Sequence, residues 1–247
     1  MKKMLIVCLF LVAAGSLFAE TLPDWFIPLR ETVYEQEQKS DEVSKLSGQI
    51  EAKARLMLSG FSLDAILARC EYYKGRSYQY DGMNKLAISH YENGMAYAEK
   101  SIKAQPSSEG YEILAANISQ LCTLKSKLWV MLHGLDVEKY AKLALSYNAE
   151  NANAQYMISA RWIYAPSPFS DVGRGIVEMK DLLNGPYILT REDIFNANIS
   201  VGYSLLRQKK PGEAESWIKK ALEIYPTNKY AQDLLFGNEK PVEISIK

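Results

Sequence analysis

The chain contains 247 residues, and its 29 basic and 29 acidic side chains balance to a formal net charge of zero. This balance gives no electrostatic reason to expect nucleic acid or an anionic membrane surface as a partner. The composition shows no sign of disorder, and the length suffices for one sizeable domain or a small repeat array.

The N-terminal segment has the pattern of a cleavable secretory signal. Lys2 and Lys3 precede an apolar run over residues 4–12, and small residues follow as far as Ala19, where we place the cleavage. The run is shorter than the roughly 20 apolar residues needed to span a membrane. Cys8 lies inside the run rather than after it, so the segment lacks a lipoprotein cleavage motif.

Removal of residues 1–19 takes away two lysines and leaves 27 basic against 29 acidic residues, a net charge near −2. We therefore expect a soluble mature protein in the periplasm or outside the cell, with no membrane insertion after cleavage. Along the mature chain we expect a leader and helix over 20–61, a helical repeat domain over 62–236 and a polar tail over 237–247.

Cys70 and Cys122 are the cysteines of the mature chain, and an exported location permits a disulfide between them. Each lies in an apolar helical context without a close-spaced motif, which favours two small buried residues instead. His90 and His133 have no acidic or cysteine companion at ligand spacing. We therefore expect neither a metal site nor a cofactor.

Helical spacing of the apolar residues dominates the chain. After a proline-containing leader, the first helical segment is expected over residues 30–59, ended by Gly60. The first repeat then spans 68–101. Its first helix ends near Tyr80, the pair Asp81-Gly82 makes the turn, and its second helix covers 83–104 before Pro106.

The central part of the chain is less regular. A helix is expected over 108–132, a turn at His133-Gly134, and a helix over 137–147. Two shorter helices follow over 152–164 and 172–183. Pro166 and Pro168 lie between them and cannot sit inside a helix, and Ser170 or Asp171 can cap the second one.

The last unit begins near Asp193 and has its turn at 209–212. Pro226 leads into a terminal helix over 229–236 and a polar tail.

Two stretches 127 residues apart follow the same spacing of small and large residues, at intervals of 3, 9, 4 and 3. The first consists of Gly75, Tyr78, Ala87, Tyr91 and Gly94, and the second of Gly202, Leu205, Ala214, Ile218 and Ala221. Small residues at these positions let two helices approach closely. We expect Gly75 to face Ala87 and Gly202 to face Ala214. Tyr91 and Ile218 are expected to fill the space toward the neighbouring hairpin, and Gly94 and Ala221 to admit the next helix.

Residues 68–101 and 195–228 resemble tetratricopeptide (TPR) motifs, which are helix–turn–helix units of 34 residues. The resemblance extends loosely over 62–236 and implies an all-α, right-handed superhelix of helical hairpins. The central repeats are enlarged by about 25 residues relative to regular units. The tryptophan expected near each repeat start is absent, since Glu71 and Asn198 stand there.

A second resemblance rests on the signal segment, the irregular hairpins and the break at Tyr164-Ala-Pro-Ser-Pro-Phe169. Together these features are similar to the periplasmic T-components associated with TRAP transporters. The missing lipoprotein motif departs from that family.

The TPR resemblance implies a concave face lined by the first helix of each unit. From the first repeat it takes Arg69, Tyr72, Arg76, Gln79 and Tyr80, and from the last Asn196, Ile199, Tyr203, Leu206 and Arg207. Arginine and tyrosine on one face suit the recognition of carboxylates and extended peptides. The alternative is a solvated helix face with half-buried tyrosines.

A second candidate site is the proline-rich loop, because long loops in compact repeats are often functional. Trp162, Tyr164 and Phe169 are the aromatic residues expected to wall a pocket there. The alternative is that they fill the gap left by a stretched hairpin.

Motifs of nucleophilic, metal-dependent or phosphate-binding catalysis are absent from the sequence, so we do not expect an enzyme. The favoured function is an exported scaffold that binds a partner protein or peptide on its concave face. The alternative is a periplasmic solute-handling component of a transport system, bound to a transport subunit or a small solute, with a pocket between the central hairpins.

Overall fold

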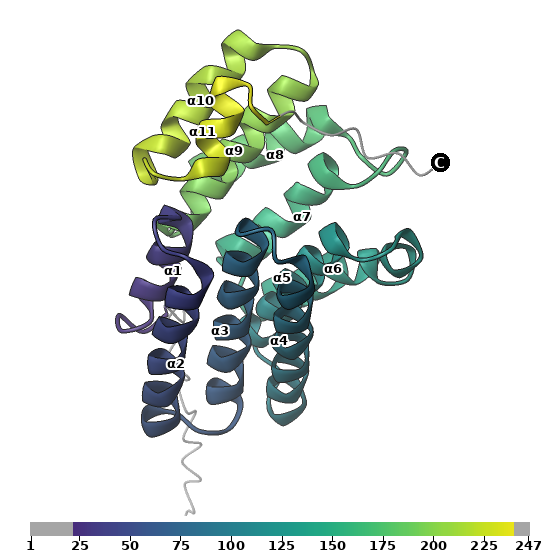
Figure 1. Ribbon diagram of the computed structural model, residues 1–247. Coiled ribbons are helices and arrows are strands. Elements are labelled where there is room, and N and C mark those ends of the chain that lie inside the picture. Colours follow the sequence, from purple (N-terminus) through teal and green to yellow (C-terminus); the bar gives the residue numbers. More distant parts are fainter. Residues whose placement is uncertain (1–21, 240–247) are drawn as a thin grey trace, which may run out of the picture.

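The computed structural model describes residues 22–239, which form eleven helices and no strand (Figure 1). The helices are α1 (Ile27–Glu35), α2 (Ser40–Met57), α3 (Gly60–Tyr80), α4 (Asn84–Ala104), α5 (Ser108–Leu124), α6 (Lys127–Tyr147), α7 (Ala152–Tyr164), α8 (Val172–Asn184), α9 (Arg191–Arg207), α10 (Pro211–Ile224) and α11 (Lys229–Phe236). The all-α expectation is therefore confirmed. The expected signal segment 1–19 and residues 240–247 of the tail lie outside the described residues.

The helices pack as successive hairpins, α3 with α4, α5 with α6, α7 with α8 and α9 with α10. The first helices of these hairpins contact one another in series, whereas the second helices each flank the next hairpin. Two layers result, an inner one of α3, α5, α7 and α9 and an outer one of their partners. The helix α1 contacts both α3 and α9, so it joins the two ends of the inner layer (Figure 1).

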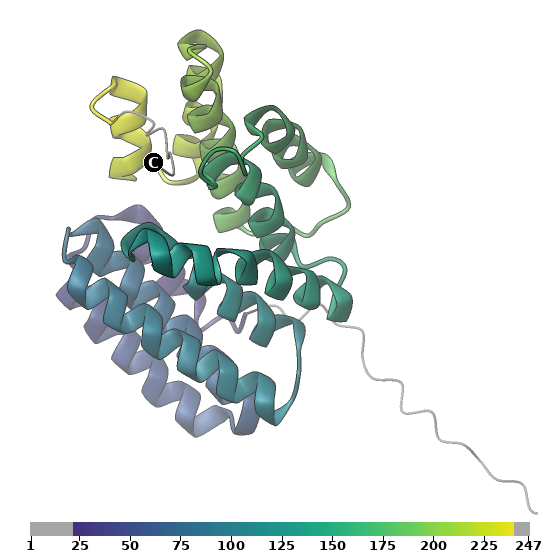
Figure 2. The same ribbon diagram turned by 90° about the vertical axis from the view of Figure 1, so that its right-hand side faces the viewer.

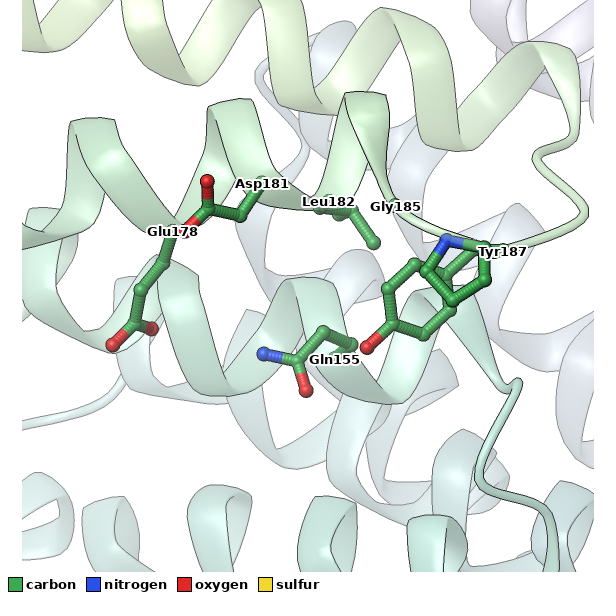
Figure 3. Close-up of a pocket in the computed structure, with 7 residues that line it drawn as sticks. Gln155, Glu178, Asp181, Leu182, Gly185 and Tyr187 are labelled. Carbon is green, nitrogen blue, oxygen red and sulfur yellow. The ribbon is translucent and has the colours of Figure 1, made fainter.

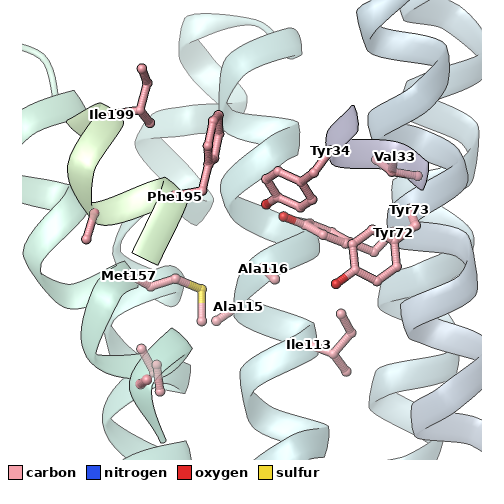
Figure 4. Close-up of a cluster of buried hydrophobic side chains, with 14 of the residues drawn as sticks. Val33, Tyr34, Tyr72, Tyr73, Ile113, Ala115, Ala116, Met157, Phe195 and Ile199 are labelled. Atoms are coloured by element: carbon pink, nitrogen blue, oxygen red, sulfur yellow. The ribbon is translucent and has the colours of Figure 1, made fainter. Parts of the chain in front are cut away.

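The core lies where the inner helices converge. Figure 4 shows Tyr72 and Tyr73 of α3 on one side and Phe195 of α9 on the other, with small residues of α5 between them. These side chains are almost completely removed from water. Burial of apolar surface shared by several hairpins is what stabilises such an array, because no single hairpin covers its own apolar face.

The regular hairpins depend on close approach at glycine. A Cβ atom on Gly75 would lie 2.5 Å from Cε1 of Tyr91, and one on Gly202 would lie 2.6 Å from Cγ1 of Ile218 and 3.5 Å from the Ala214 carbonyl oxygen. We expected Tyr91 and Ile218 to pack toward the neighbouring hairpin. Each instead lies over the glycine of its own hairpin.

Gly94 of α4 lies where α5 approaches the first repeat, as expected. A Cβ atom on Gly94 would collide with the side-chain amide of Asn117 in α5, so only glycine admits α5 at this distance. Ala221, the corresponding residue of the last repeat, is completely buried.

The expected helix over 30–59 is wrong as a single helix, because α1 ends at Glu35 and α2 begins at Ser40. Gln36 takes a left-handed conformation with φ of 56°, and its backbone N–H bonds the Thr32 carbonyl. Its side-chain oxygen accepts a hydrogen bond from the backbone N–H of Lys229, 2.8 Å away. This tertiary bond accompanies the break, and Asp41 and Glu42 in the first turn of α2 are the local signal of the new helix start.

The expected turn at His133-Gly134 is also wrong. The chain turns earlier, between Leu124 and Lys127. His133 and Gly134 therefore lie inside α6. Ser126 caps the new helix, since its hydroxyl accepts a hydrogen bond from the Trp129 N–H. A single glycine costs a helix only about 1 kcal/mol, so Gly134 does not end it.

The remaining boundaries agree closely with expectation. Gly82, with φ of 74°, lies in the turn after α3, and Asp171 caps α8. The helix over 152–164 and the terminal helix over 229–236 are confirmed. The last turn is shorter than expected, because Pro211 begins α10, a position where the missing N–H of proline costs nothing. None of the helices in the described part of the chain is long and apolar enough to cross a membrane.

Replacement of Gly75 by alanine should destabilise the fold by about 1–3 kcal/mol, because the new methyl group collides with the Tyr91 ring. The matched control is Gly48→Ala in α2, where a Cβ atom has nothing within 4 Å. That change should stabilise the helix by up to about 1 kcal/mol. Urea unfolding of the mature chain measures both, and equal effects at the two positions would contradict the close approach.

Candidate functional site

Arg76 is the central polar residue of the inner face. It lies in α3 one turn after Tyr72 and one turn before Tyr80, so the three side chains share a face. Its guanidinium donates to the hydroxyls of Tyr72, 2.9 Å away, and of Tyr34, 3.4 Å away, and also to the Tyr80 hydroxyl. The guanidinium carbon stands 5.0–5.8 Å from the centroids of the same three rings.

No carboxylate of the described residues lies within 4 Å of the Arg76 guanidinium, although arginine forms ion pairs elsewhere in the molecule. Phenol oxygens and ring faces carry only partial negative charge. A half-buried cation normally pairs with an anion, because partial loss of water is otherwise unfavourable. Within residues 22–239 its link to a carboxylate is indirect, because the Tyr34 hydroxyl accepts from Arg76 and donates to Glu192. Arg76 therefore lacks a direct carboxylate partner in the described part of the chain, and its guanidinium can receive an external anion.

Tyrosines from three other helices complete this site. In α7, the hydroxyls of Tyr156 and Tyr164 lie 3.3 and 3.0 Å from the Ser200 hydroxyl of α9. The Tyr164 ring packs against Tyr203, with centroids 5.3 Å apart. Tyr230 adds a fourth phenol from α11.

The pKa shifts of two of these tyrosines have causes among the same residues. Burial raises the pKa of Tyr156, and the positive charge of Arg76 opposes that rise. Burial also raises the pKa of Tyr230, and Tyr203, Tyr156 and Tyr80 add to the effect. We call Arg76, Tyr80, Tyr156, Tyr164, Tyr203 and Tyr230 the inner tyrosine cluster.

The inner tyrosine cluster keeps contact with solvent. Arg76, Tyr156 and Tyr164 are half-buried, and Tyr80 is 37% exposed, whereas Tyr203 is buried. Groups that are partly desolvated yet still reachable from solvent are those that a ligand can contact. The cluster therefore combines a cation, several hydroxyl groups and aromatic surface in an accessible place.

Arg69, expected on the concave face, is instead part of the interior. Its guanidinium forms an ion pair with Glu112 of α5, and both side chains are almost completely buried. The other carboxylate oxygen of Glu112 accepts a hydrogen bond of 2.7 Å from Asn153 of α7. Burial raises the pKa of Glu112 even though Arg69 favours its charged form. Arg69 thus links three helices of the inner layer.

Asn196 and Arg207, the other polar residues expected on this face, also have internal partners. Asn196 donates to the Tyr34 hydroxyl, 3.0 Å away. Arg207 donates to the carbonyl oxygen of Ile163 in the last turn of α7, a favourable place for a cation. Of the expected partner-binding residues, Arg76 and the partly exposed Tyr80 have the contacts that best suit binding.

Tyr34, Tyr156 and Tyr230 also belong to this region, although the sequence pattern did not predict them there. Tyr156 and Tyr164 stand eight residues apart, so they lie on one face of the correctly predicted helix. That spacing was the available signal. Tyr34 and Tyr230 reach the region through tertiary packing of α1 and α11, for which no local pattern exists.

The three aromatic residues proposed to wall a loop pocket are not brought together. Trp162 lies between two guanidinium groups. Its ring centroid is 4.4 Å from the guanidinium carbon of Arg161 and 3.9 Å from that of Arg174. Tyr164 faces α9 in the inner tyrosine cluster, and Phe169 is 54% exposed.

A different, open pocket lies toward the other end of this hairpin, between the start of α7, the end of α8 and the segment after α8 (Figure 3). It is lined by Gln155, Glu178, Asp181, Leu182, Gly185, Pro186 and Tyr187. In Figure 3, Gln155 and Tyr187 face each other, whereas the carboxylates of Glu178 and Asp181 point away from them. Glu178 already accepts a 2.6 Å hydrogen bond from Arg174. The acidic groups therefore do not converge on one point.

Both cysteines of the described chain are free thiols. Cys70 is buried and Cys122 is half-buried. Burial raises the pKa of Cys70 to about 12 and that of Cys122 to about 11, so both remain protonated at neutral pH. Among residues 22–239 no cluster of three potential metal ligands occurs.

Comparison of the chain with models of known protein families gave no match, and a comparison with curated proteins gave none either.

Replacement of Glu112 by alanine should destabilise the protein by about 3–5 kcal/mol, because Arg69 would remain buried without a carboxylate. The double change Arg69→Met with Glu112→Leu should recover most of the loss. As a control, Glu215→Ala removes an exposed ion pair with Lys219, 2.6 Å long, and should change stability little. Urea unfolding measures the series, and equal effects of Glu112→Ala and Glu215→Ala would contradict the structural role.

Proposed function

We propose that this chain is an exported, TPR-like binding protein without catalytic activity. Its partner is a protein or peptide segment that presents a carboxylate to Arg76 on the inner face. The observation that carries the proposal is an arginine held among three tyrosines with no carboxylate partner among the described residues.

The chemistry of the inner tyrosine cluster fits such a segment. A guanidinium binds a carboxylate through two parallel hydrogen bonds, which are stronger than bonds between neutral groups. Tyr72 and Tyr34 already hold the guanidinium in place, so little side-chain freedom is lost on binding. The phenols of Tyr156 and Tyr164 provide hydroxyl groups and ring faces for the rest of a peptide.

The distribution of the cluster favours an extended ligand over a compact one. Its members come from α3, α7, α9 and α11, and none of them lines the pocket beside α8. An extended segment can contact several helices of a repeat array at once, which is how such arrays bind their partners.

A second candidate function is the handling of a small solute in a periplasmic transport system, which involves a transport subunit. The observation that favours it is the open pocket between α7 and α8, in the irregular third hairpin. Its polar lining and the Tyr187 ring suit a small polar molecule (Figure 3).

Removal of the Arg76 guanidinium should abolish binding of the partner segment. We expect Arg76→Ala to weaken the affinity for carboxylate-bearing peptides at least about tenfold, and Arg76→Lys to weaken it less, because a point charge replaces the two-bond contact. The measurement is fluorescence anisotropy with a peptide library. Each peptide is prepared in two forms, one with a free C-terminal carboxylate and one with an amidated C-terminus. The control is Arg55→Ala, which removes an exposed arginine from α2.

Circular dichroism establishes that the variants keep their helices. Equal binding by Arg76→Ala and Arg55→Ala, or indifference to amidation and to acidic side chains, would sink the peptide proposal. A small molecule retained by the purified protein in native mass spectrometry would support the solute alternative if Tyr187→Ala releases it. Release by Trp162→Ala or Phe169→Ala would point to the loop instead.

A further inference from the structure

The hydrogen bonds of Arg76 use its guanidinium unevenly. Nη1 donates to the hydroxyls of Tyr34 and Tyr72, so both of its N–H groups are engaged. Nη2 donates to the Tyr80 hydroxyl. A guanidinium carries five N–H donors, so Nε–H and one N–H of Nη2 have no acceptor among residues 22–239.

This distribution decides how a carboxylate can bind to Arg76. Two parallel hydrogen bonds to a carboxylate need one N–H group from each of two nitrogens on the same edge of the guanidinium. The edge formed by Nη1 and Nη2 is closed, because the Nη1 donors are held by two phenols. The edge formed by Nε and Nη2, which we call the outer edge of Arg76, is left for an external carboxylate.

The two phenols on Nη1 belong to the core. Tyr34 is completely buried and Tyr72 is 6% exposed. The Tyr34 ring packs against Phe195 and Tyr225, with centroids 5.5 and 5.3 Å away, and its hydroxyl donates to Glu192. These contacts fix both the ring and the direction of its O–H group. The two tyrosines therefore orient the guanidinium and stay in place when a ligand arrives.

The phenol on Nη2 is held differently. Tyr80 is the last residue of α3, is 37% exposed and is not part of the hydrophobic core. Its ring contacts the Arg76 guanidinium, whose carbon stands 5.0 Å from the ring centroid. Exposed side chains change rotamer within picoseconds to nanoseconds. Tyr80 can therefore leave Nη2 without disturbing the core.

The surroundings of Tyr80 suit an incoming anion. In Figure 2, the turn that joins α3 to α4 lies below the yellow helix α11, so the end of α3 and α11 are on the same side of the molecule. Tyr80 contributes to the raised pKa of Tyr230 in α11, and burial raises the pKa of Tyr156 in α7. Both phenols stay protonated at neutral pH, so they add no negative charge that would repel a carboxylate.

We propose that an incoming carboxylate binds the outer edge of Arg76 and replaces the Tyr80 hydroxyl on Nη2. This inference rests on the proposed function and names the residue that controls access to its cation. A neutral acceptor gains little by replacing a phenol, whereas a carboxylate forms a hydrogen bond roughly twice as strong. Tyr80 therefore selects for charged ligands, while Tyr34 and Tyr72 orient the guanidinium.

Two matched variants should change the affinity in opposite directions. Tyr80→Phe keeps the ring and removes the competing hydroxyl, so a carboxylate should bind about two- to tenfold more tightly. Tyr72→Phe removes a bond that orients the guanidinium, so binding should weaken by a similar factor. The probe is sodium acetate at constant ionic strength, with acetamide as its neutral control. Tighter binding by Tyr72→Phe, or no gain from Tyr80→Phe, would overturn the proposal.

The Nε–H resonance of Arg76 in a ¹H–¹⁵N NMR spectrum reports on the outer edge directly. Arg76→Lys removes this resonance and so assigns it. Acetate should shift it, acetamide should not, and the midpoint should fall at a lower acetate concentration in Tyr80→Phe. The resonance of Arg55, an exposed arginine of α2, is the control and should move only at higher concentrations. Equal responses of Arg55 and Arg76 would mean adventitious binding and would overturn the proposal.

Failure of this inference and failure of the proposed function give different results. If Arg76→Ala weakens the binding of carboxylate peptides but Tyr80→Phe does not strengthen it, the peptide-binding function stands and the role of Tyr80 is wrong. If Arg76→Ala leaves peptide binding unchanged, the proposed function fails. An acetate shift at Arg76 that Tyr80→Phe enhances would in that case still establish a carboxylate site on the outer edge.

Discussion

Glu192 lies at the start of α9 with only 5% of its surface exposed, and a carboxylate buried to this degree requires hydrogen-bond donors. Two tyrosines supply them. The Tyr34 hydroxyl donates from α1 at 2.8 Å, and the Tyr73 hydroxyl donates from α3 at 2.5 Å. The partners stand 158 and 119 residues earlier in the chain. The start of the last hairpin is therefore held against the first, and the inner layer of helices is joined at its two ends.

The neighbouring bonds extend this link from α1 to α11. Asn228 donates to the Tyr34 carbonyl and Thr227 donates to the Glu35 carbonyl, each at 2.7 Å. These bonds satisfy carbonyl groups that the end of α1 leaves without helical partners. Because the Tyr34 hydroxyl also accepts from Arg76, the contact that joins the ends of the array helps to hold the cation of the inner tyrosine cluster. Stability and the candidate binding function thus depend on the same residue.

The inner face shows how far a helical pattern can be carried. The TPR resemblance implied that Arg69 and Arg76 share the concave face, and both lie on α3 in the inner layer. Arg69 is buried against Glu112, which stands 43 residues later in the chain. Arg76 has no direct carboxylate partner among the described residues. Nothing within α3 distinguishes the two arginines, because the difference comes entirely from which residues α5 and α1 place opposite them.

The sequence by itself determined the helical class, most helix ends and the two regular hairpins. These features follow from local rules, such as the 3.6-residue period, capping side chains and glycine at close approaches like Gly202. Only the tertiary structure decided where α5 ends and α6 begins, and which arginine of α3 pairs directly with a carboxylate of the described residues. It also decided that Leu128, Met131, Leu132 and Leu135 of α6 are exposed. The physical reason is that burial and charge pairing depend on residues far apart in the chain, whereas periodicity and capping act within a few residues.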